Sequence, residues 1–506
     1  MPYAERHPYE ADARFDGGDL DCGNGLLLLI RQHIDPLEPG QLLEFRSTEI
    51  SVEEDFPAWC RMTGNELVSV TRDGRQRSFL VCKGPLGERP RRGGLPRPPR
   101  PISHAVVAVQ IPAVLPPPAP VTAVPPLSVM GIGSWPRPRW MLTAIHDRIE
   151  GRLSEEDFSA TAEDATRLAV AAQLRAGVDV VTDGEQRRDN YASFVGGRLD
   201  NCQLIPLTDL LPLVDDPVKF EEEMQSLDVP ASDVRHPALF GPLSRSRPIA
   251  VHELEFVRRV TDRPVKVALP GPYLLTRIMW MECISDRAYR SREHLADDIV
   301  RVLREELHFL LAGGAVLVQL DEPVLSEVVF TGAKSVRSFM CGALSEKGDA
   351  TRELAFATAL INRVVAGLPR DRLGLHVCRG NWTRDERAAL AGDYRPLLPL
   401  LQAVEVGTLF LELCTPRAGE LDVLREVPAD RRLAVGVVNQ KLDEVESPEV
   451  IAARARRAIE IFGAERVLLT PDCGFATFAD SPVASALAAE QKLARIAEAA
   501  RILRRG

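Results

Sequence analysis

The sequence has no long apolar segment. A membrane-spanning helix needs about 20 consecutive apolar residues, and no stretch of this chain approaches that length. The first residues, MPYAERHPYEADARF, lack the apolar core of a secretory signal. We therefore expect a cytoplasmic protein that does not bind membranes.

The sequence also lacks a basic stripe and a dense cysteine pattern. The formal net charge is −10 with both signs interspersed, whereas proteins that bind nucleic acids usually concentrate positive charge. Nine cysteines scattered over 506 residues are not typical of a disulfide framework. We expect no nucleic-acid partner, and we expect selected cysteines to be ligands or nucleophiles.

Chain length and proline content predict two domains with a spacer between them. A chain of 506 residues is too long for one typical domain. Residues 85–126 contain GERPRRGGLPRPPRP and AVLPPPAPVTAVPP, and prolines this dense exclude helix interiors and central strands. The predicted division is a small domain at 1–84, a proline-rich linker at 85–126 and a large domain at 127–506.

The small domain is predicted to be a two-layer α/β sandwich. GLLLLIRQHIDPL and VEEDFPAWCRMTG have helical patterns, and Gly64 follows the second of them. GQLLEFRST is typical of a strand. NELVSVTRDGRQRSFLVCK predicts a hairpin that turns at Asp73 and Gly74.

The large domain is predicted to be a (β/α)8 barrel, also called a TIM barrel, with insertions. Short apolar runs alternate with longer amphipathic stretches, which is the pattern of this fold. The runs lie at 127–134, 178–185, 265–271, 315–323, 372–378, 406–414, 432–440 and 466–473. The stretch at 201–264 is too long for one connection, so we expect extra helices there, including one around 216–224.

Reactive residue types gather where these runs end. In a (β/α)8 barrel the catalytic side chains lie at the carboxyl ends of the strands. An aspartate there can instead cap the next helix, so neither Asp183 nor Asp472 alone identifies a site. The residues at these ends are Ser134, Asp183, Glu185, Asp321, Glu322, His376, Cys378, Glu412, Cys414, Asn439, Asp472 and Cys473.

A zinc site is the chemistry that this set favours. His376 and Cys378 are two residues apart, and such residues point to the same side of a strand. Cys473 supplies a third ligand, and either Glu412 or Cys414 is a candidate for the fourth, which matches tetrahedral zinc. A zinc with two thiolates is better suited to holding a substrate thiol as thiolate, for alkyl transfer to sulfur, than to hydrolysis. The His-x-Cys pair alone is also compatible with a buried pair that binds no metal.

From Val129 onward the chain resembles the catalytic barrel of the cobalamin-independent methionine synthase (MetE) family. The resemblance rests on GIGSWPR, DGEQRRDNY, LPGPY, QLDEP, HVCRGN, LELCTPRAGE and PDCGF, which occur in the family's order. It implies a zinc-dependent methyltransferase with the ligands His376, Cys378, Glu412 and Cys473. It also implies that Ser134, Glu185 and Asp321 bind an amino-acid substrate, the two acids through its ammonium group.

The resemblance leaves the methyl donor open. Full-length synthases of this family carry a second, N-terminal barrel that helps to bind a folate donor, and this chain has none. The expected partners are a small-molecule thiol and a methyl donor, with corrinoid or other methyl-carrier proteins as candidates for the donor.

Residues 16–84 resemble the TusA/SirA sulfur-carrier family. Those proteins place a cysteine before a helix in a C-P-x-P motif, where the helix dipole lowers the pKa of the thiol. Cys22 occupies that position, although the motif here reads CGNG. The resemblance implies that Cys22 carries sulfur and that sulfurtransferases are candidate partners.

Together these observations favour a zinc-dependent S-methyltransferase coupled to a sulfur carrier. One alternative is a methionine synthase proper, which makes methionine from homocysteine with a folate or corrinoid methyl donor. Another is a non-catalytic scaffold for sulfur trafficking.

Overall fold

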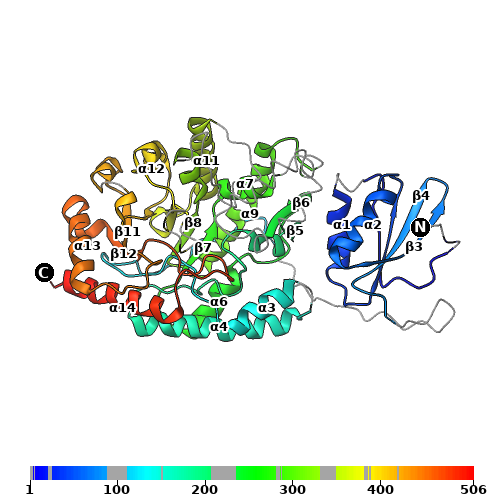
Figure 1. The fold of residues 1–506 in the computed structure, drawn as a ribbon. Helices are drawn as coiled ribbons and strands as arrows, with labels where there is room; N and C mark the ends of the chain where they lie inside the picture. Colours follow the sequence, from blue (N-terminus) through cyan, green and yellow to red (C-terminus); the bar gives the residue numbers. More distant parts are fainter. Residues whose placement is uncertain are drawn as a thin grey trace.

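The computed structural model contains a small N-terminal unit and a larger unit built around a parallel sheet (Figure 1). It describes residues 4, 6–20, 25–87, 111–149, 152–206, 235–280, 285, 288–330, 349–380, 384, 386, 389–418 and 421–505. Among these residues, none of the helices combines the length and the apolar character needed to cross a bilayer.

In the small unit, two helices pack on one four-stranded sheet with the order β1-β2-β4-β3. The predicted helices and the β3–β4 hairpin are present, and Gly64 ends α2 in the left-handed conformation with φ 71°. The sequence reading missed β1, which pairs parallel with β2. The elements are β1 (Ala13–Asp16), α1 (Leu27–Ile34), β2 (Leu42–Ser47), α2 (Val52–Thr63), β3 (Glu66–Asp73) and β4 (Gln76–Cys82).

In the large unit, six parallel strands form one sheet with the order β12-β11-β10-β9-β8-β7. Almost every residue of these strands is buried, as expected for strands covered on both faces. They coincide with the last six apolar runs of the sequence. The strands are β7 (Lys266–Pro270), β8 (Leu317–Asp321), β9 (Leu373–Val377), β10 (Thr408–Leu411), β11 (Arg432–Val438) and β12 (Val467–Pro471).

The first two apolar runs form single parallel bridges rather than full strands. Val129 pairs with Leu469 of β12, and Met130 pairs with Val180. Val181 then pairs with Val265, the residue before β7. The bridges therefore lead from one edge of the six-stranded sheet back to its other edge.

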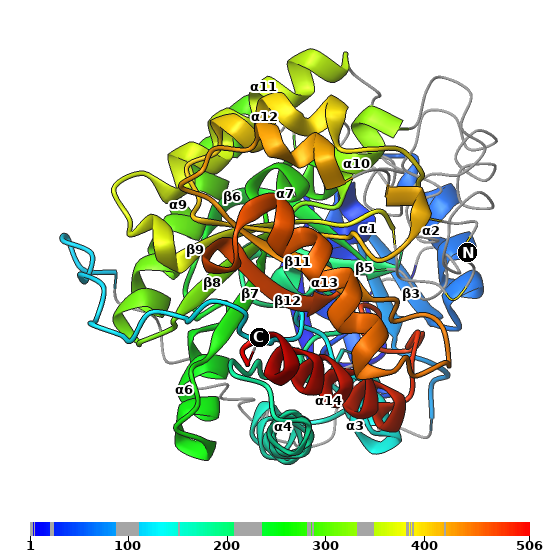
Figure 2. The same cartoon turned by 90° about the vertical axis from the view of Figure 1, so that its left-hand side faces the viewer.

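Helices surround this sheet (Figure 2). Ser154 begins α4 and Ser447 begins α13, each accepting a hydrogen bond from the main-chain N–H three residues on, as expected for helix N-caps. The helices are α3 (Arg139–Ile149), α4 (Glu155–Ala176), α6 (Val251–Val260), α7 (Pro272–Met279), α9 (Arg292–Ala312), α10 (Val324–Phe330), α11 (Ala350–Val365), α12 (Leu398–Ala403), α13 (Pro448–Phe462) and α14 (Ala486–Leu503).

The insertion after the second apolar run contains an antiparallel hairpin that the sequence reading missed. Its strands are β5 (Asp200–Pro206) and β6 (Arg235–Ser244). The helix predicted around 216–224 lies outside the described residues. Helix α1 of the small unit lies beside β5, and its Leu28 joins the main core of the large unit (Figure 1).

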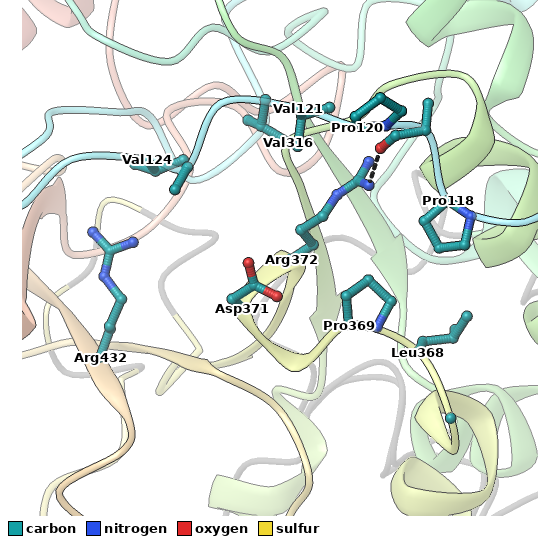
Figure 3. A pocket seen from close by; sticks show the side chains of 13 residues that line it. Pro118, Pro120, Val121, Val124, Val316, Leu368, Pro369, Asp371, Arg372 and Arg432 are labelled. Atoms are coloured by element: carbon teal, nitrogen blue, oxygen red, sulfur yellow. Dashed lines mark hydrogen bonds between the residues drawn. The ribbon is translucent and has the colours of Figure 1, made fainter.

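The last part of the predicted linker is held against the large unit. Arg372 donates hydrogen bonds to the carbonyls of Ala119 (2.7 Å), Leu311 (2.9 Å) and Ala315 (3.1 Å). Val121 and Val124 pack against an apolar cluster that includes Met130, Val316 and Leu468. Figure 3 shows Arg372 bonded to the main chain of this segment in a pocket that the prolines help to line. The segment at 111–126 is therefore a strap on the large unit. Of the predicted linker at 85–126, only the part before residue 111 remains as a candidate spacer.

We predict that Arg372→Ala loosens the strap and lowers the free energy of unfolding by about 2–4 kcal/mol, because two buried carbonyls and one part-buried carbonyl lose a charged donor. Arg432→Ala is the matched control, since Arg432 makes one bond, to Pro125, at 3.1 Å; we expect it to cost less than about 1 kcal/mol. Urea denaturation measures both losses. Hydrogen exchange at 111–126 should accelerate in Arg372→Ala. Unchanged exchange there would contradict the role of Arg372 in holding the strap.

Candidate metal and substrate site

Three of the predicted metal ligands come together at the carboxyl ends of two strands. His376 lies in β9 and Cys378 directly follows that strand, whereas Cys473 lies two residues beyond β12. One potential ligand atom from each residue lies within 4.8 Å of the other two, and all three side chains are buried. In a flat sheet, β9 and β12 would be about 14 Å apart, three strand spacings. The curvature of the sheet therefore creates this site.

A hydrogen bond fixes which nitrogen of His376 faces the thiols. Nδ1 lies 2.8 Å from Oδ1 of Asp321. A carboxylate only accepts hydrogen bonds, so Nδ1 carries the proton in the neutral imidazole. Nε2 is buried and has no hydrogen-bond partner. This nitrogen is therefore the one whose lone pair can bind a metal, the arrangement that carboxylate partners commonly impose on histidine ligands.

The two thiols are coupled to each other. A hydrogen bond with Cys473 lowers the pKa of Cys378 to about 7, against the effect of burial and with the help of His376. The same hydrogen bond, together with burial, raises the pKa of Cys473 well above its usual value. The two sulfurs thus lie within hydrogen-bond reach of each other, and a cation that binds thiolates between them would displace protons.

The predicted fourth ligand is close but stands apart from this group. Glu412 directly follows β10 and is fully buried. Its charge raises the pKa of both Cys378 and Cys473, yet its carboxylate is not among the atoms within 4.8 Å. The alternative, Cys414, is not part of the group either. Its main-chain N–H donates to Asp472 at 2.9 Å.

The three residues predicted to bind substrate line the same cavity as the three ligands. Ser134, Glu185 and Asp321 all face it, and the cavity also receives Tyr191 and Thr477, which the sequence reading did not select. Neither of these two stands at the end of an apolar run; Tyr191 closes the DGEQRRDNY motif, which could have pointed to it, whereas Thr477 lies outside the motifs. The site therefore joins a group of soft ligands to two carboxyl groups in one cavity.

Glu185 is held in a costly conformation. Its φ is 55°, a left-handed value that side chains other than glycine rarely adopt. Arg137 donates to its carbonyl at 2.7 Å and so helps to hold the backbone there. Burial raises the pKa of the Glu185 carboxyl to about 7, although the charge of Arg188 opposes the rise. Strain of this kind persists where the surroundings enforce it, commonly at functional sites. Its Oε2 has no hydrogen-bond partner, so it can receive a ligand.

Cys22 lies outside the described residues, and the structure gives no position for its thiol. The described cavity is lined by residues of the large unit alone.

The fold and the site together define a class of protein. It is a mixed α/β protein with a group of potential metal ligands at the carboxyl ends of a parallel sheet.

Comparison with known families makes this more specific. A family model described as "Cobalamin-independent synthase, Catalytic domain" matches residues 127–496. The match spans most of the chain, so this chain belongs to the cobalamin-independent methionine synthase catalytic-domain family. Membership implies a methyltransferase. Residues 1–126 precede the matched span.

Similar proteins cover the same region. A methionine synthase of Saccharolobus solfataricus is 26% identical over 386 residues, which are 76% of this chain and 97% of that protein. A methionine synthase of Thermococcus kodakarensis is 28% identical over 344 residues, which are 68% of this chain and 85% of that protein.

Solved structures support the fold. A B12-independent methionine synthase from Shewanella sp. W3-18-1, solved in complex with selenomethionine, has a TM-score of 0.57 and 23% identity over 75% of this chain and 98% of its own. A putative vitamin-B12-independent methionine synthase from Listeria monocytogenes has a TM-score of 0.52 and 19% identity over 76% of this chain and 99% of its own. At these identities the likeness concerns the fold alone.

Proposed function

We propose that this protein is a zinc-dependent methyl or alkyl transferase that acts on a thiol. The observation that carries the proposal is the buried group of His376, Cys378 and Cys473, with the lone pair of His376 Nε2 facing no partner. Imidazole and thiolate are the usual ligands of zinc in proteins. When bound there, zinc would hold a substrate thiol as a nucleophilic thiolate at neutral pH.

We propose Glu412 as the fourth ligand. It is fully buried, and its charge already acts on both thiols. Cys414 is less suited, because the charges that act on its thiol are those of Asp472, Arg454 and Glu446, whereas Glu412 acts on the two cysteines of the ligand group.

The architecture that we propose for the large unit is a (β/α)8 barrel. Six strands are paired in one parallel sheet, and three single bridges connect its two edges through Val129, Met130, Val180 and Val181. The convergence of β9 and β12 on one ligand group supports closure, since a flat sheet would hold them apart. Barrel closure places all eight strand ends around one mouth.

The thiol substrate that we propose is an amino acid, with homocysteine as the first candidate. If homocysteine is the substrate, the enzyme is a methionine synthase. Glu185 and Asp321 offer carboxyl groups beside the ligand group, and an acid binds an ammonium group through a strong, orienting hydrogen bond. Ser134 faces the same cavity and adds a hydroxyl. The role of these side chains is to align the sulfur and to exclude water while the methyl group is transferred. The second partner is a methyl donor, either a small molecule or a carrier protein.

For residues 1–84 we propose a TusA-like sulfur-carrier domain with Cys22 as the carrier. Support comes from the position of Cys22 shortly before α1 and from the contact of α1 with β5, which follows the second apolar run. The six cysteines that the structure describes form no disulfide with one another, which fits the reducing cytoplasm that we propose. Sulfurtransferases are the proposed partners of this domain.

Metal analysis tests the zinc proposal. We predict about one zinc per chain in the wild-type protein and its loss in Cys473→Ser, because a hydroxyl is a far weaker ligand than a thiolate. Cys414→Ser is the control and should keep its zinc. A wild-type protein that binds no zinc, with both thiols reactive, would instead favour a non-catalytic scaffold.

The affinity for an ammonium ligand should depend on pH through Glu185. Because the pKa of its carboxyl is about 7, the group is mostly neutral at pH 6 and mostly charged at pH 8. We predict that L-methionine binds up to about tenfold more weakly at pH 6 than at pH 8, by isothermal titration calorimetry. Glu185→Gln should weaken binding at pH 8 and flatten this dependence. The exposed control Glu426→Gln should retain it, and a full slope in Glu185→Gln would rule out this role.

Sulfur transfer tests the carrier proposal. We predict that Cys22→Ser abolishes persulfide formation after incubation with a cysteine desulfurase and cysteine, because the acceptor thiol is lost. Its zinc content should stay at the wild-type level. Mass spectrometry of the intact protein measures the added sulfur, and an equal gain of sulfur in Cys22→Ser would contradict the assignment.

A further inference from the structure

A lysine is buried inside the parallel sheet, away from solvent. Lys266 begins β7 and is fully buried. Its Nζ donates to the carbonyl of Ile132 at 2.6 Å and to Oε1 of Gln319 at 2.5 Å, and it lies 4.4 Å from the centre of the Phe410 ring. A buried lysine is costly unless its partners compensate, so its presence here calls for an explanation.

The lysine is the first member of a chain of hydrogen bonds that ends at the ligand group. Gln319 and Asp321 are two residues apart on β8, so both side chains lie on the same face of the strand. Nε2 of Gln319 donates to Oδ1 of Asp321 at 2.7 Å. The same oxygen accepts from Nδ1 of His376 at 2.8 Å.

The chemistry of Lys266 and Asp321, on either side of Gln319, gives this chain of hydrogen bonds a fixed direction. An amide oxygen cannot donate, so in the contact between Lys266 and Oε1 of Gln319 it is Nζ that donates, whether or not the lysine is charged. The amide nitrogen must then point to the carboxylate of Asp321, which can only accept. Asp321 in turn requires the proton of His376 on Nδ1. Each link therefore fixes the orientation of the next, and the outcome is a lone pair on His376 Nε2.

We propose that Lys266 and Gln319 are positioning residues for His376, which they orient through Asp321. This inference rests on the proposed metal site. Gln319 holds Oδ1 of Asp321 where the imidazole can reach it, and Lys266 holds Gln319. Neither residue lines the cavity, so neither is expected to touch the substrate.

A role in packing alone would have a different consequence. Loss of a packing lysine lowers stability but leaves the affinity for metal unchanged once the protein is folded. Loss of a residue that hydrogen-bonds to a metal ligand typically weakens metal binding 10- to 100-fold. Gln319 and Lys266 act through Asp321, so we expect an effect near the lower limit, about tenfold.

The test compares Lys266→Met and Gln319→Met with Lys492→Met. Lys492 is the matched control, because it is also a buried lysine, and its Nζ donates to the carbonyls of Asn439 (2.9 Å) and Glu444 (2.6 Å). Competition with a chromophoric chelator gives the zinc affinity of each folded protein. We expect the dissociation constant to rise about tenfold in the first two variants and less than twofold in the control.

A second measurement needs no metal. Nitrogen-15 NMR of histidine-labelled, metal-free protein reports the tautomer of His376 at a pH where the imidazole is neutral, with His376→Asn to assign its signals. We expect the Nδ1–H tautomer in the wild-type protein and a mixture in the two variants. Gln319→Glu is the alternative if a methionine variant does not fold, since it keeps an acceptor for Lys266 but loses the donor to Asp321.

The outcomes separate this proposal from the proposed function. An unchanged tautomer, or a zinc affinity within twofold of the wild-type value in folded variants, overturns the positioning role. A wild-type protein that binds no zinc overturns the metal site, while the tautomer measurement still decides whether Lys266 and Gln319 orient His376.

Discussion

The site depends on the parallel pairing of β8 with β9, which sets Asp321 directly opposite His376 in the ladder. Backbone hydrogen bonds thereby bring the carboxylate and the imidazole to within 2.8 Å, before any metal or substrate contributes. That contact decides which imidazole nitrogen keeps its proton and which offers a lone pair to the thiols. The curvature of the sheet supplies the rest, because it carries Cys473 from β12 to the same point.

The same carboxylate links two tasks that the site must perform together. Asp321 orients a proposed metal ligand, and it also lines the cavity beside Glu185, where we propose that the ammonium group of the substrate binds. A thiol substrate anchored there through its ammonium group would hold its sulfur close to the ligand group. Burial strengthens these polar contacts because no water competes for them. The strained backbone of Glu185 fits this picture, since the surroundings hold a costly conformation where a carboxyl group is needed.

Much of this could be predicted from the sequence, because apolar runs identify buried strands and polar residues at their ends identify a site. His376, Cys378 and Cys473 were found in this way, and the structure brings them together. The relay from Lys266 through Gln319 was not found. Lys266 appears in the sequence only as a polar interruption of an apolar run. Gln319 begins the QLDEP motif, but the motif does not show what its side chain contacts, because that contact depends on the register between β7 and β8. The strap at 111–126 was missed for a related reason: dense proline excludes helices and central strands, but it does not reveal what the segment packs against.

The measurement that tests the central claim most directly is X-ray absorption spectroscopy at the zinc edge of the zinc-loaded protein. The account predicts one zinc with two sulfur ligands at about 2.3 Å and two nitrogen or oxygen ligands at about 2.0–2.2 Å. Addition of homocysteine should raise the number of sulfur ligands to three, as the substrate thiol joins the site. A zinc coordination shell without sulfur, or a number of sulfur ligands that homocysteine does not change, would contradict the account.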